Sequence, residues 1–487
     1  MSGVAKNIFH LLTSSVLQKA IAFVYFALIA RWAGVEDTGA YFFALSWTLM
    51  FTTITDMGLT PVLIREAAKD KTRTEKYLNQ TLALKLPLTV VAVLAAVVGA
   101  WLFRVEPGTR LLVTLAAVVI SLDAISLTFY GVLRAHHVLK YEGLGLVVGQ
   151  TVTMVIGLAS LKLGAPLAIL VVALIAGSSW NALASIWIVR KRLGIRARLA
   201  WDWGFAKAIL RMAVPFALAG AFVKVYTSAD AVLLTHFKGE AAAGLYSVPY
   251  KLTFAFQFVP MAFTAAFYPA MSRAYAADKR ELGDLFYKAL WALMLIAAPI
   301  AAGIMALAPE LVDFVYGQDY LPAVAALQVL IVSVLPIFLD FPIGSLLNAS
   351  DRQMTQTKLM GMATVISVVL NLALIPAYGL TGVVIASVVS HAALLLGGFI
   401  MVGKFLEWPA LKFAGVAIRA TLAASAMFVG VTLAKAYVPF PAAVLVGVVL
   451  YPAAAFALRA VTVADLKGLL RSVRAPSVPP PIATTTP

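Results

Sequence analysis

The sequence contains no cysteine, and charged residues make up only 12% of its 487 positions. A chain without cysteine cannot form a disulfide, a thiolate metal site or a cysteine nucleophile. Its five histidines, two of them adjacent at His136 and His137, show no spacing typical of metal ligands. A soluble domain is about a quarter charged, whereas 62% of these residues are hydrophobic. The scarcity of charged residues and the abundance of hydrophobic ones argue against a soluble enzyme and predict a protein that lies mostly within a membrane.

The sequence also lacks a Walker motif, an uninterrupted glycine-rich phosphate loop and the residue spacing of a catalytic triad. None of its polar segments is long enough to hold a separate nucleotide-binding or catalytic domain. We therefore predict that the protein is not an enzyme and that it uses no organic cofactor and no metal centre. A coupling proton or sodium ion is left open, because acidic residues within membrane spans often mark ion pathways.

Long apolar runs dominate the chain, and a membrane-spanning helix needs about 20 mostly apolar residues. The stretch 359–402 contains no charged residue and is too long for one span. Within it, IPAYGLTG at 375–382 has a proline and two glycines, which predict a tight turn between two helices. The predicted fold class is therefore an all-α polytopic membrane protein with about fourteen spans. We expect them at residues 8–30, 39–64, 77–103, 111–133, 142–161, 165–189, 208–235, 242–270, 284–308, 320–349, 357–376, 380–402, 411–434 and 439–458.

Basic residues exceed acidic ones by 38 to 22, which gives a formal net charge of +16. If the N-terminus is cytoplasmic, most Lys and Arg between the spans fall on the cytoplasmic side, as the positive-inside rule requires. The excess then reflects orientation in a cell (inner) membrane, and no nucleic acid is expected as a partner. An even number of spans places both termini in the cytoplasm. The apolar N-terminal run lacks a cleavage site, so it is expected to be the first span.

One pattern of glycine and tyrosine occurs twice. GVEDTGAYFFAL begins at Gly34 and GEAAAGLYSVPY begins at Gly239, and both contain Gly, four residues, Gly, one residue and Tyr. The same displacement of 205 residues places Lys19 on Lys224. Six spans separate the two copies, so both enter the membrane in the same direction. Transporters built from such parallel repeats have their substrate site at the repeat interface.

This repeat predicts two pseudo-symmetric six-helix bundles that face each other. A basic cytoplasmic linker joins them, and an extra helix pair follows the second bundle. The predicted boundaries are 1–190 for the N-terminal bundle, 191–207 for the linker, 208–403 for the C-terminal bundle, 404–460 for the extra pair and 461–487 for a cytoplasmic tail, whose proline-rich and threonine-rich end is expected to be disordered.

Two lysines lie near the middle of their predicted spans, where an ionisable residue is costly and usually faces a cavity or a partner. Lys19 and Lys224 are roughly 16 Å from either membrane surface at a rise of 1.5 Å per residue, which is too far for comfortable snorkelling. We predict that both line a central cationic cavity that attracts a pyrophosphate headgroup. The alternative is a structural ion pair. Lys251 lies near the start of the eighth predicted span, in the second copy of the repeat. Its side chain is expected either to line the same cavity or to snorkel to the membrane surface.

Acidic residues also lie within the spans, and Asp56 and Asp230 are the candidates for binding a coupling proton or sodium ion. The alternative for each is a structural role beside a lysine or a helix end. Asp230 follows Lys224 by six residues, so the two side chains do not share a helix face. The other two such acids are Asp123 and Asp340.

Several charged residues lie closer to the predicted inner membrane surface. Arg65, next to Glu66, is expected to act in a gate or in a structural ion pair. Lys85, Arg211 and Lys288 are expected to snorkel towards that surface.

Over about residues 8–403 the chain resembles the Wzx-type polysaccharide transporters, which flip lipid-linked oligosaccharides. The matching stretches are ARWAGVEDTGAYFFALSW, TDMGLTPVLIREAA, SADAVLLTHFKGEAAAGLYSVPYKL and NLALIPAYGLTGVVIASVVSH. These transporters share a superfamily with the multidrug and toxic-compound extruders (MATE proteins). The resemblance implies a MATE-like fold of two bundles around a V-shaped cavity, without ATP hydrolysis. Asp56 matches the acidic residue usual at that position in the family.

The resemblance and the central lysines together predict a flippase for a polyprenyl-diphosphate-linked glycan. It would move this substrate from the cytoplasmic to the outer leaflet by alternating access, for surface polysaccharide biosynthesis. The other expected partners are membrane lipids, with polysaccharide-assembly proteins left open. One alternative is a drug or cation antiporter of the same fold, whose cavity should be acidic or aromatic. An alternative of another class is a non-transporting membrane component of a glycan polymerase or ligase complex.

Overall fold

The computed structural model describes residues 3–462, and this part of the chain contains helices and no strands. Most of the predicted tail, residues 463–487, lies outside the described residues. The first half contains α1 (Gly3–Ala33), α2 (Val35–Asp56), α3 (Leu59–Lys69), α4 (Thr74–Leu102), α5 (Pro107–Ala135), α6 (Lys140–Lys162) and α7 (Ala168–Leu193), with a short 3₁₀ helix η1 (Lys71–Arg73).

The second half contains α8 (Trp203–Ala255), α9 (Phe258–Ala277), α10 (Lys279–Ala306), α11 (Ala308–Tyr316), α12 (Val324–Leu330), α13 (Val334–Ala349) and α14 (Gln353–Gly403). Two 3₁₀ segments, η2 (Gln318–Ala323) and η3 (Ile331–Ser333), lie on either side of α12. The extra pair is α15 (Ala410–Ala434) and α16 (Phe440–Ala457), and α15 packs on α10.

Eleven helical stretches of the described chain are long and apolar enough to cross a membrane. Two of these stretches, 203–277 and 353–403, are long enough for two spans each. The backbone turns sharply inside them, at Gly239 and at Gly379. A further span is formed by α2 and α3, which are separated by Met57 and Gly58 in the left-handed conformation. The all-α polytopic fold with about fourteen spans is therefore confirmed.

The repeated glycines have a structural reason. Gly34 and Gly239 have φ values of 85° and 82° with extended ψ, a region that is essentially restricted to glycine. Each one changes the chain direction between two helices of its half. The second glycine of each copy, Gly39 or Gly244, then lies one turn into the next helix, on the face that meets the other half.

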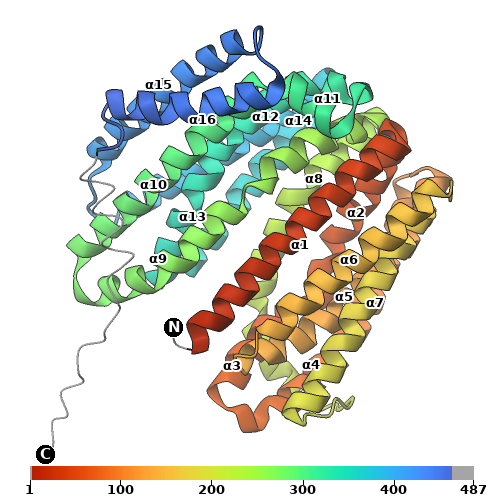
Figure 1. Ribbon diagram of the computed structural model, residues 1–487. Coiled ribbons are helices and arrows are strands. Elements are labelled where there is room, and N and C mark those ends of the chain that lie inside the picture. The colour runs from red at the N-terminus through yellow and green to blue at the C-terminus, as the bar shows by residue number, and fades with distance from the viewer. Residues whose placement is uncertain (1–2, 463–487) are drawn as a thin grey trace, which may run out of the picture.

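The two halves form two groups of helices that lie side by side (Figure 1). They come together at the end where α1 passes into α2, and their ribbons diverge towards the end that carries the N-terminus. The turns at Gly34 and Gly239 lie at the first of these ends, because Val35 and Glu240, which follow them, contact the opposite half. We call the first the seam end and the second the open end. The first turns of α8 pack in one core cluster with the first half, through Ala206, Ile209 and Ala213. The domain boundaries predicted from the sequence stay a prediction.

Close backbone contacts join the halves at the seam end. A Cβ atom added to Gly39 would lie 1.8 Å from the carbonyl oxygen of Glu240, and one added to Gly244 would lie 1.9 Å from that of Val35. The two glycines are therefore needed for reciprocal close packing of α2 against α8. We call these four residues the glycine seam.

Hydrogen bonds between the halves surround the glycine seam. The Arg31 guanidinium donates to the Phe314 carbonyl at 3.0 Å. The Tyr320 hydroxyl lies 3.1 Å from the carbonyl oxygen of Gly34 and 3.2 Å from that of Ala30. All three acceptors are backbone carbonyls, so these hydrogen bonds join side chains of one half to the main chain of the other.

The segment between α7 and α8 is held against the first half. The backbone N–H of Arg198 donates to the Asn79 amide oxygen at 2.7 Å, and that of Asp202 donates to the Gln80 amide oxygen at 2.9 Å. Both amide side chains are buried in α4. The basic segment between the halves is thus fixed at its C-terminal part.

Candidate functional site

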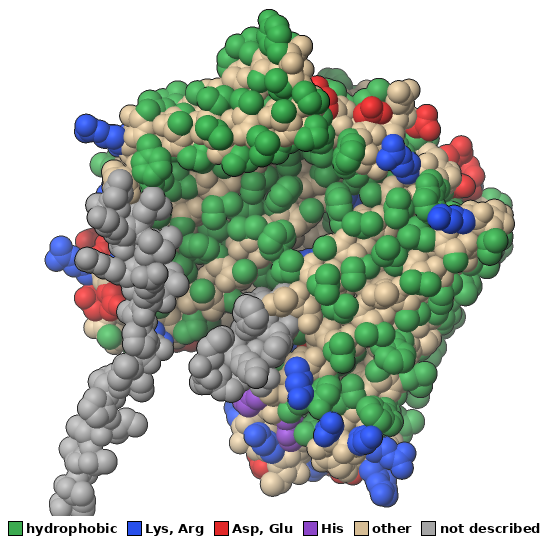
Figure 2. Space-filling view, in the orientation of Figure 1, with side chains coloured by type: hydrophobic (Ala, Val, Ile, Leu, Met, Phe, Trp, Pro, Cys, Tyr) green, Lys and Arg blue, Asp and Glu red, His purple; other side chains and the backbone are tan. Residues whose placement is uncertain are grey.

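A cavity of about 610 Å³ lies where the two halves face each other, and Figure 2 shows the hollow between them. On α2, which runs from the seam end towards the open end, the cavity is lined only by positions from Leu49 onwards. The cavity therefore occupies the middle of the molecule and the part towards the open end. Its polar wall is formed by α1, α2, α5, α6 and α7, while the second half contributes residues of α8.

Lys224 is one of the cavity-lining residues, and its ammonium group is in none of the described ion pairs or hydrogen bonds. Lys19 is exposed on α1 and does not line the cavity, although its neighbour Gln18 does. Of the three predicted substrate-binding lysines, the structure thus brings Lys224 into this cavity. The role of all three residues stays a prediction.

Lys251 lies between the two halves, outside this cavity. Its ammonium nitrogen is 4.7 Å from the centre of the Phe26 ring and 5.9 Å from that of Phe42. A cation over the face of an aromatic ring is stabilised by the ring quadrupole, by about 2 kcal/mol when the pair is desolvated. These rings belong to α1 and α2, so Lys251 contacts the first half from the second.

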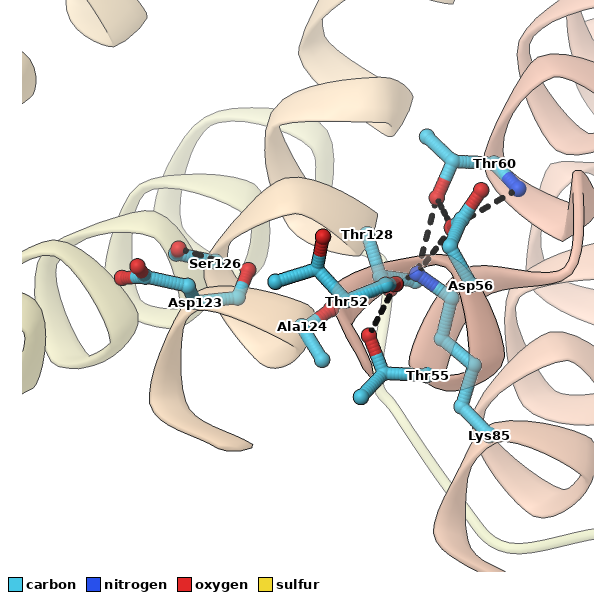
Figure 3. A network of polar contacts seen from close by, with 9 residues as sticks. All are labelled: Thr52, Thr55, Asp56, Thr60, Lys85, Asp123, Ala124, Ser126 and Thr128. Carbon is cyan, nitrogen blue, oxygen red and sulfur yellow. Dashed lines mark hydrogen bonds and ion pairs between the residues drawn. The ribbon is translucent and has the colours of Figure 1, made fainter. Parts of the chain in front are cut away.

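Asp56 lines the cavity and forms an ion pair with Lys85, whose ammonium nitrogen lies 2.6 Å from its carboxylate (Figure 3). The Lys85 side chain is only 4% exposed and also donates to the Thr60 hydroxyl at 2.8 Å. The expectation that Lys85 snorkels is therefore wrong, because Asp56 gives it a partner inside the protein. The same carboxylate accepts hydrogen bonds from the backbone N–H and the hydroxyl of Thr60, so Asp56 connects α2 to the first turn of α3.

Arg65 lies on α3, where its guanidinium donates to the neighbouring Glu66 at 2.8 Å and contacts the Met212 sulfur of α8 at 3.3 Å. The side chain is 44% exposed. The structure therefore places it on the surface of α3 beside the second half and outside the cavity lining. A gating role stays a prediction.

Asp230 lies within the second half and lines a separate cavity of about 240 Å³, together with Asp340 and His391. Its carboxylate accepts hydrogen bonds from the Tyr246 hydroxyl at 2.9 Å and from the Asn371 amide at 2.7 Å. Two buried oxygens near this cavity have no hydrogen-bond partner among the described atoms: Asn371 Oδ1 and Asp340 Oδ1. Buried oxygens that accept no hydrogen bond are suitable ligands for a hard cation or a proton.

Sequence reasoning missed the amide side chains of the cavity wall. Gln18 donates to Gln150 at 3.3 Å, and the Tyr130 hydroxyl donates to Asn181 at 2.8 Å. All four residues line the cavity. A usable signal was the row of small residues spaced four apart on α6, which lies against these polar groups: Gly145, Gly149, Thr153 and Gly157.

A second ion pair marks the part of the cavity nearest the open end. Arg134, in the last turn of α5, donates hydrogen bonds to both carboxylate oxygens of Glu142, in the first turn of α6. Glu142 is buried, and both residues line the cavity. The two charges of this pair neutralise each other, and Asp56 is paired with Lys85. The acidic and basic side chains of the lining that stay outside the described ion pairs are therefore Lys224 and Asp123.

The chain matches two known protein families. Residues 4–275, more than half of the chain, match the family described as polysaccharide biosynthesis protein. Residues 215–373 match the MatE family. The two matched regions overlap on α8 and α9 and together cover both halves of the fold.

Curated relatives align over most of the chain. The capsular polysaccharide biosynthesis protein CapF of Staphylococcus aureus is 20% identical over 395 residues, which cover 80% of this chain and 97% of CapF. The probable low-salt glycan biosynthesis flippase Agl15 of Haloferax volcanii is 22% identical over 406 residues, covering 80% of this chain and 81% of Agl15.

Solved structures show the same fold. The lipid II flippase MurJ in an inward closed conformation superposes with a TM-score of 0.75 at 14% identity, covering 92% of this chain and 98% of MurJ. An inward-facing MATE multidrug transporter gives a TM-score of 0.66 at 18% identity, covering 80% and 95%. Together with the family match and the flippase among the relatives, these solved transporters confirm the prediction that the chain is not an enzyme. This multi-pass membrane protein therefore belongs to the polysaccharide biosynthesis protein family, as a Wzx-type member of the superfamily that includes the MATE transporters.

Proposed function

We propose that this protein flips a polyprenyl-diphosphate-linked oligosaccharide from the cytoplasmic to the outer leaflet during surface polysaccharide biosynthesis. The observation that carries the proposal is the cavity between the halves, with the unpaired ammonium group of Lys224 on its wall. A cation in a partly desolvated space attracts a diphosphate more strongly than it would in water. The flippase among the relatives, Agl15, supports the same activity.

The transport step is an exchange between two arrangements of the halves. The polar headgroup enters the cavity from the open end, while the apolar lipid tail stays in the bilayer between the two groups of helices. Separation of the glycine seam and closure of the open end then expose the headgroup to the other side. Lys19, exposed beside the lining residue Gln18 on α1, meets the diphosphate on entry, and Lys251 meets it near the seam.

The proposed orientation places the open end in the cytoplasm of a cell (inner) membrane. The basic loops at residues 65–76 and 190–207 lie at the ends of helices opposite the glycine seam, which agrees with the positive-inside rule. Both termini are then cytoplasmic. Other polysaccharide-assembly proteins are partners in this scheme, because the flipped glycan must pass to enzymes that extend or attach it.

A coupling cation, either a proton or a sodium ion, binds at Asp230 in this proposal. Asp230, Asn371 and Asp340 would hold it through side-chain oxygens, and the partnerless buried oxygens at this cavity support the assignment. Asp56 is the weaker candidate, because its ion pair with Lys85 already neutralises its charge.

Replacement of Lys224 tests the function directly. Lys224→Ala should lower flipping about 10-fold to 100-fold, since a hydrogen bond to a charged group is worth about 1.5–3 kcal/mol. Lys224→Arg should restore part of the activity because it keeps the charge with a different donor geometry, and Lys224→Glu should be worse than alanine. The measurement is the appearance of lipid-linked glycan on the outer face of cells in which each variant is the only copy.

The control is Lys288→Ala, because Lys288 is an exposed lysine on α10 that does not line the cavity. It should leave flipping unchanged, and membrane expression should match for all variants. Normal flipping by Lys224→Ala would contradict the proposal. An active Lys224→Glu variant that exports a cationic dye would instead favour the drug or cation antiporter.

A further inference from the structure

The wall of the central cavity is chemically asymmetric. The second half contributes three apolar residues and one cation: Phe216, Ala217, Gly220 and Lys224. The first half contributes amides, hydroxyls and carboxylates from five helices. The unpaired positive charge therefore lies on one side of the cavity, and the neutral hydrogen-bonding groups lie on the other.

The polar groups of the first half keep hydrogen-bonding capacity that the protein does not use. The Gln150 amide oxygen accepts from Gln18, while the Gln150 NH₂ group, with two N–H donors, is in none of the described hydrogen bonds. Asn181 accepts from Tyr130 and donates one N–H to the Gly177 carbonyl at 3.2 Å, which leaves a second N–H. All of these groups lie on the wall of one cavity.

Asp123 adds a carboxylate to the same wall. Its side chain is exposed to the cavity although α5 lies within the helical bundle, and it interacts with the Ser178 hydroxyl. None of the described ion pairs includes it. It is thus an acceptor that remains available to a ligand.

Glycines fix the position of the wall's side chains. A Cβ atom at Gly145 would lie 2.1 Å from the Tyr130 hydroxyl, and one at Gly149 would lie 2.3 Å from the Asn181 amide nitrogen. Any larger residue at either of these two positions would displace these groups. The wall is therefore a built surface in which Tyr130 and Asn181 are held in place before a ligand arrives, and this lowers the entropic cost of binding.

We propose that Gln150, Asn181 and Asp123 form a carbohydrate-binding wall, which recognises the sugar nearest the diphosphate while Lys224 binds the diphosphate. A sugar ring offers hydroxyl donors and acceptors around its edge, which match amides and a carboxylate. Its apolar C–H faces match the rings of Tyr130 and Phe216, which also line the cavity. This inference rests on the proposed function and deepens it by assigning the two parts of the headgroup to opposite halves.

Electrostatics decides the direction of the headgroup. A diphosphate placed against the wall would face the unpaired Asp123 carboxylate, and like charges repel in a space of low dielectric. Sugar hydroxyls placed there would instead donate hydrogen bonds to that carboxylate, and charge-assisted bonds of this kind are the stronger ones. The diphosphate therefore lies towards Lys224 and the sugar towards α5, α6 and α7.

The test compares probes with and without a sugar. Purified full-length protein would be titrated with farnesyl diphosphate and with farnesyl-diphospho-sugars that carry glucose, galactose or N-acetylglucosamine. The wild type should bind at least one sugar-bearing probe about tenfold more tightly than farnesyl diphosphate. Gln150→Ala and Asp123→Asn should each remove most of that preference while affinity for farnesyl diphosphate falls less than threefold. Lys224→Ala should weaken binding of every probe.

Two matched variants serve as controls. Gln353→Ala and Asp284→Asn change the same residue types at exposed positions outside the cavity, and they should keep the sugar preference. Binding of farnesyl diphosphate by each variant shows that it is folded. Equal affinity of the wild type for all probes, or an unchanged sugar preference in Gln150→Ala and Asp123→Asn, would overturn the carbohydrate-binding wall. Either result would leave the proposed function standing. Failure of the wild type to bind any diphosphate probe would overturn the proposed function and the wall with it.

Discussion

The ion pair between Asp56 and Lys85 is largely removed from water, with side-chain exposures of 18% and 4%. Removal of one partner from a buried pair leaves an uncompensated charge, whereas removal of both leaves none. The pair also sits at the break between α2 and α3, where Asp56 accepts the Thr60 N–H. Its main role is therefore to hold α3 at the required angle to α2.

Lys85→Met should lower the free energy of unfolding by about 3 kcal/mol, in the range measured for broken buried pairs. The double variant Asp56→Asn/Lys85→Met should recover a large part of that loss, because no unpaired charge remains. Thermal unfolding of the purified protein in detergent measures both. A double variant less stable than Lys85→Met by the full cost of Asp56→Asn would show that the two residues act independently.

The functional importance of charged residues could be predicted from the sequence, whereas that of neutral polar residues could not. Lys224 stood out because an ionisable residue in mid-span is rare, and it lines the cavity. Lys19 stood out for the same reason, yet it lies on the exposed side of α1. Asn181 and Gln150 are ordinary within a span, and only the packing of α6 against α5 and α7 brings them to one surface. Helical periodicity predicts which residues share one face of a helix, but it does not predict which neighbouring helix packs against that face.

Among the elements, α2 and α8 form the glycine seam, and its close backbone approach leaves no room for a side chain. An added methyl group at Gly39 or Gly244 would overlap a backbone carbonyl of the other half. A backbone carbonyl cannot move aside as a flexible side chain can. The seam is therefore the place where a small substitution separates the halves.

Gly39→Ala and Gly244→Ala should each reduce the population in which the seam is closed by about tenfold. The reporter is a cysteine pair at Thr109 and Glu240, whose side chains are hydrogen-bonded across the halves, joined by a short bismaleimide. Cross-linking should slow in both glycine variants.

Gly108→Ala is the control for the seam variants. Gly108 lies in the first turn of α5, next to the reporter position Thr109, and an added Cβ there meets open space. Cross-linking in this variant should proceed at the wild-type rate. Equal rates in all three variants would show that the seam does not depend on the two glycines.

The elements themselves were largely predictable, because twenty apolar residues in a row leave few alternatives to a spanning helix. The predicted turn at 375–382 contains the observed break at Gly379. The predicted span 39–64 is in fact divided at Met57 and Gly58. Hydropathy is averaged over a window, so it does not register two residues in the left-handed conformation. The cause of that break is tertiary, since Gly58 packs against the backbone of Ala213 and Ala217 on α8.

For the whole molecule, the natural absence of cysteine allows the orientation to be tested without a modified background. Single cysteines at the exposed positions Glu36, Lys238 and Gln318 should react with a membrane-impermeant maleimide added to intact cells. Cysteines at the exposed positions Thr72, Arg196 and Ala277 should react only after the membrane is made permeable. Labelling of the second set in intact cells would reverse the proposed orientation, and mixed labelling within a set would break the span count.

The contacts between the two halves determine how ionic strength affects the balance between the two arrangements. Each ion pair among the described side chains lies within the first half, or joins the second half to the extra pair. Across the seam end, the described hydrogen bonds go to the backbone carbonyls of Phe314, Gly34 and Ala30, or join the neutral Thr109 hydroxyl to the Glu240 carboxylate, and the glycine backbone packs beside them. Water can satisfy those groups when they part, so opening separates no pair of opposite charges. Ionic strength should therefore leave the balance between the two arrangements almost unchanged, even though it weakens the attraction between the cavity and an anionic headgroup.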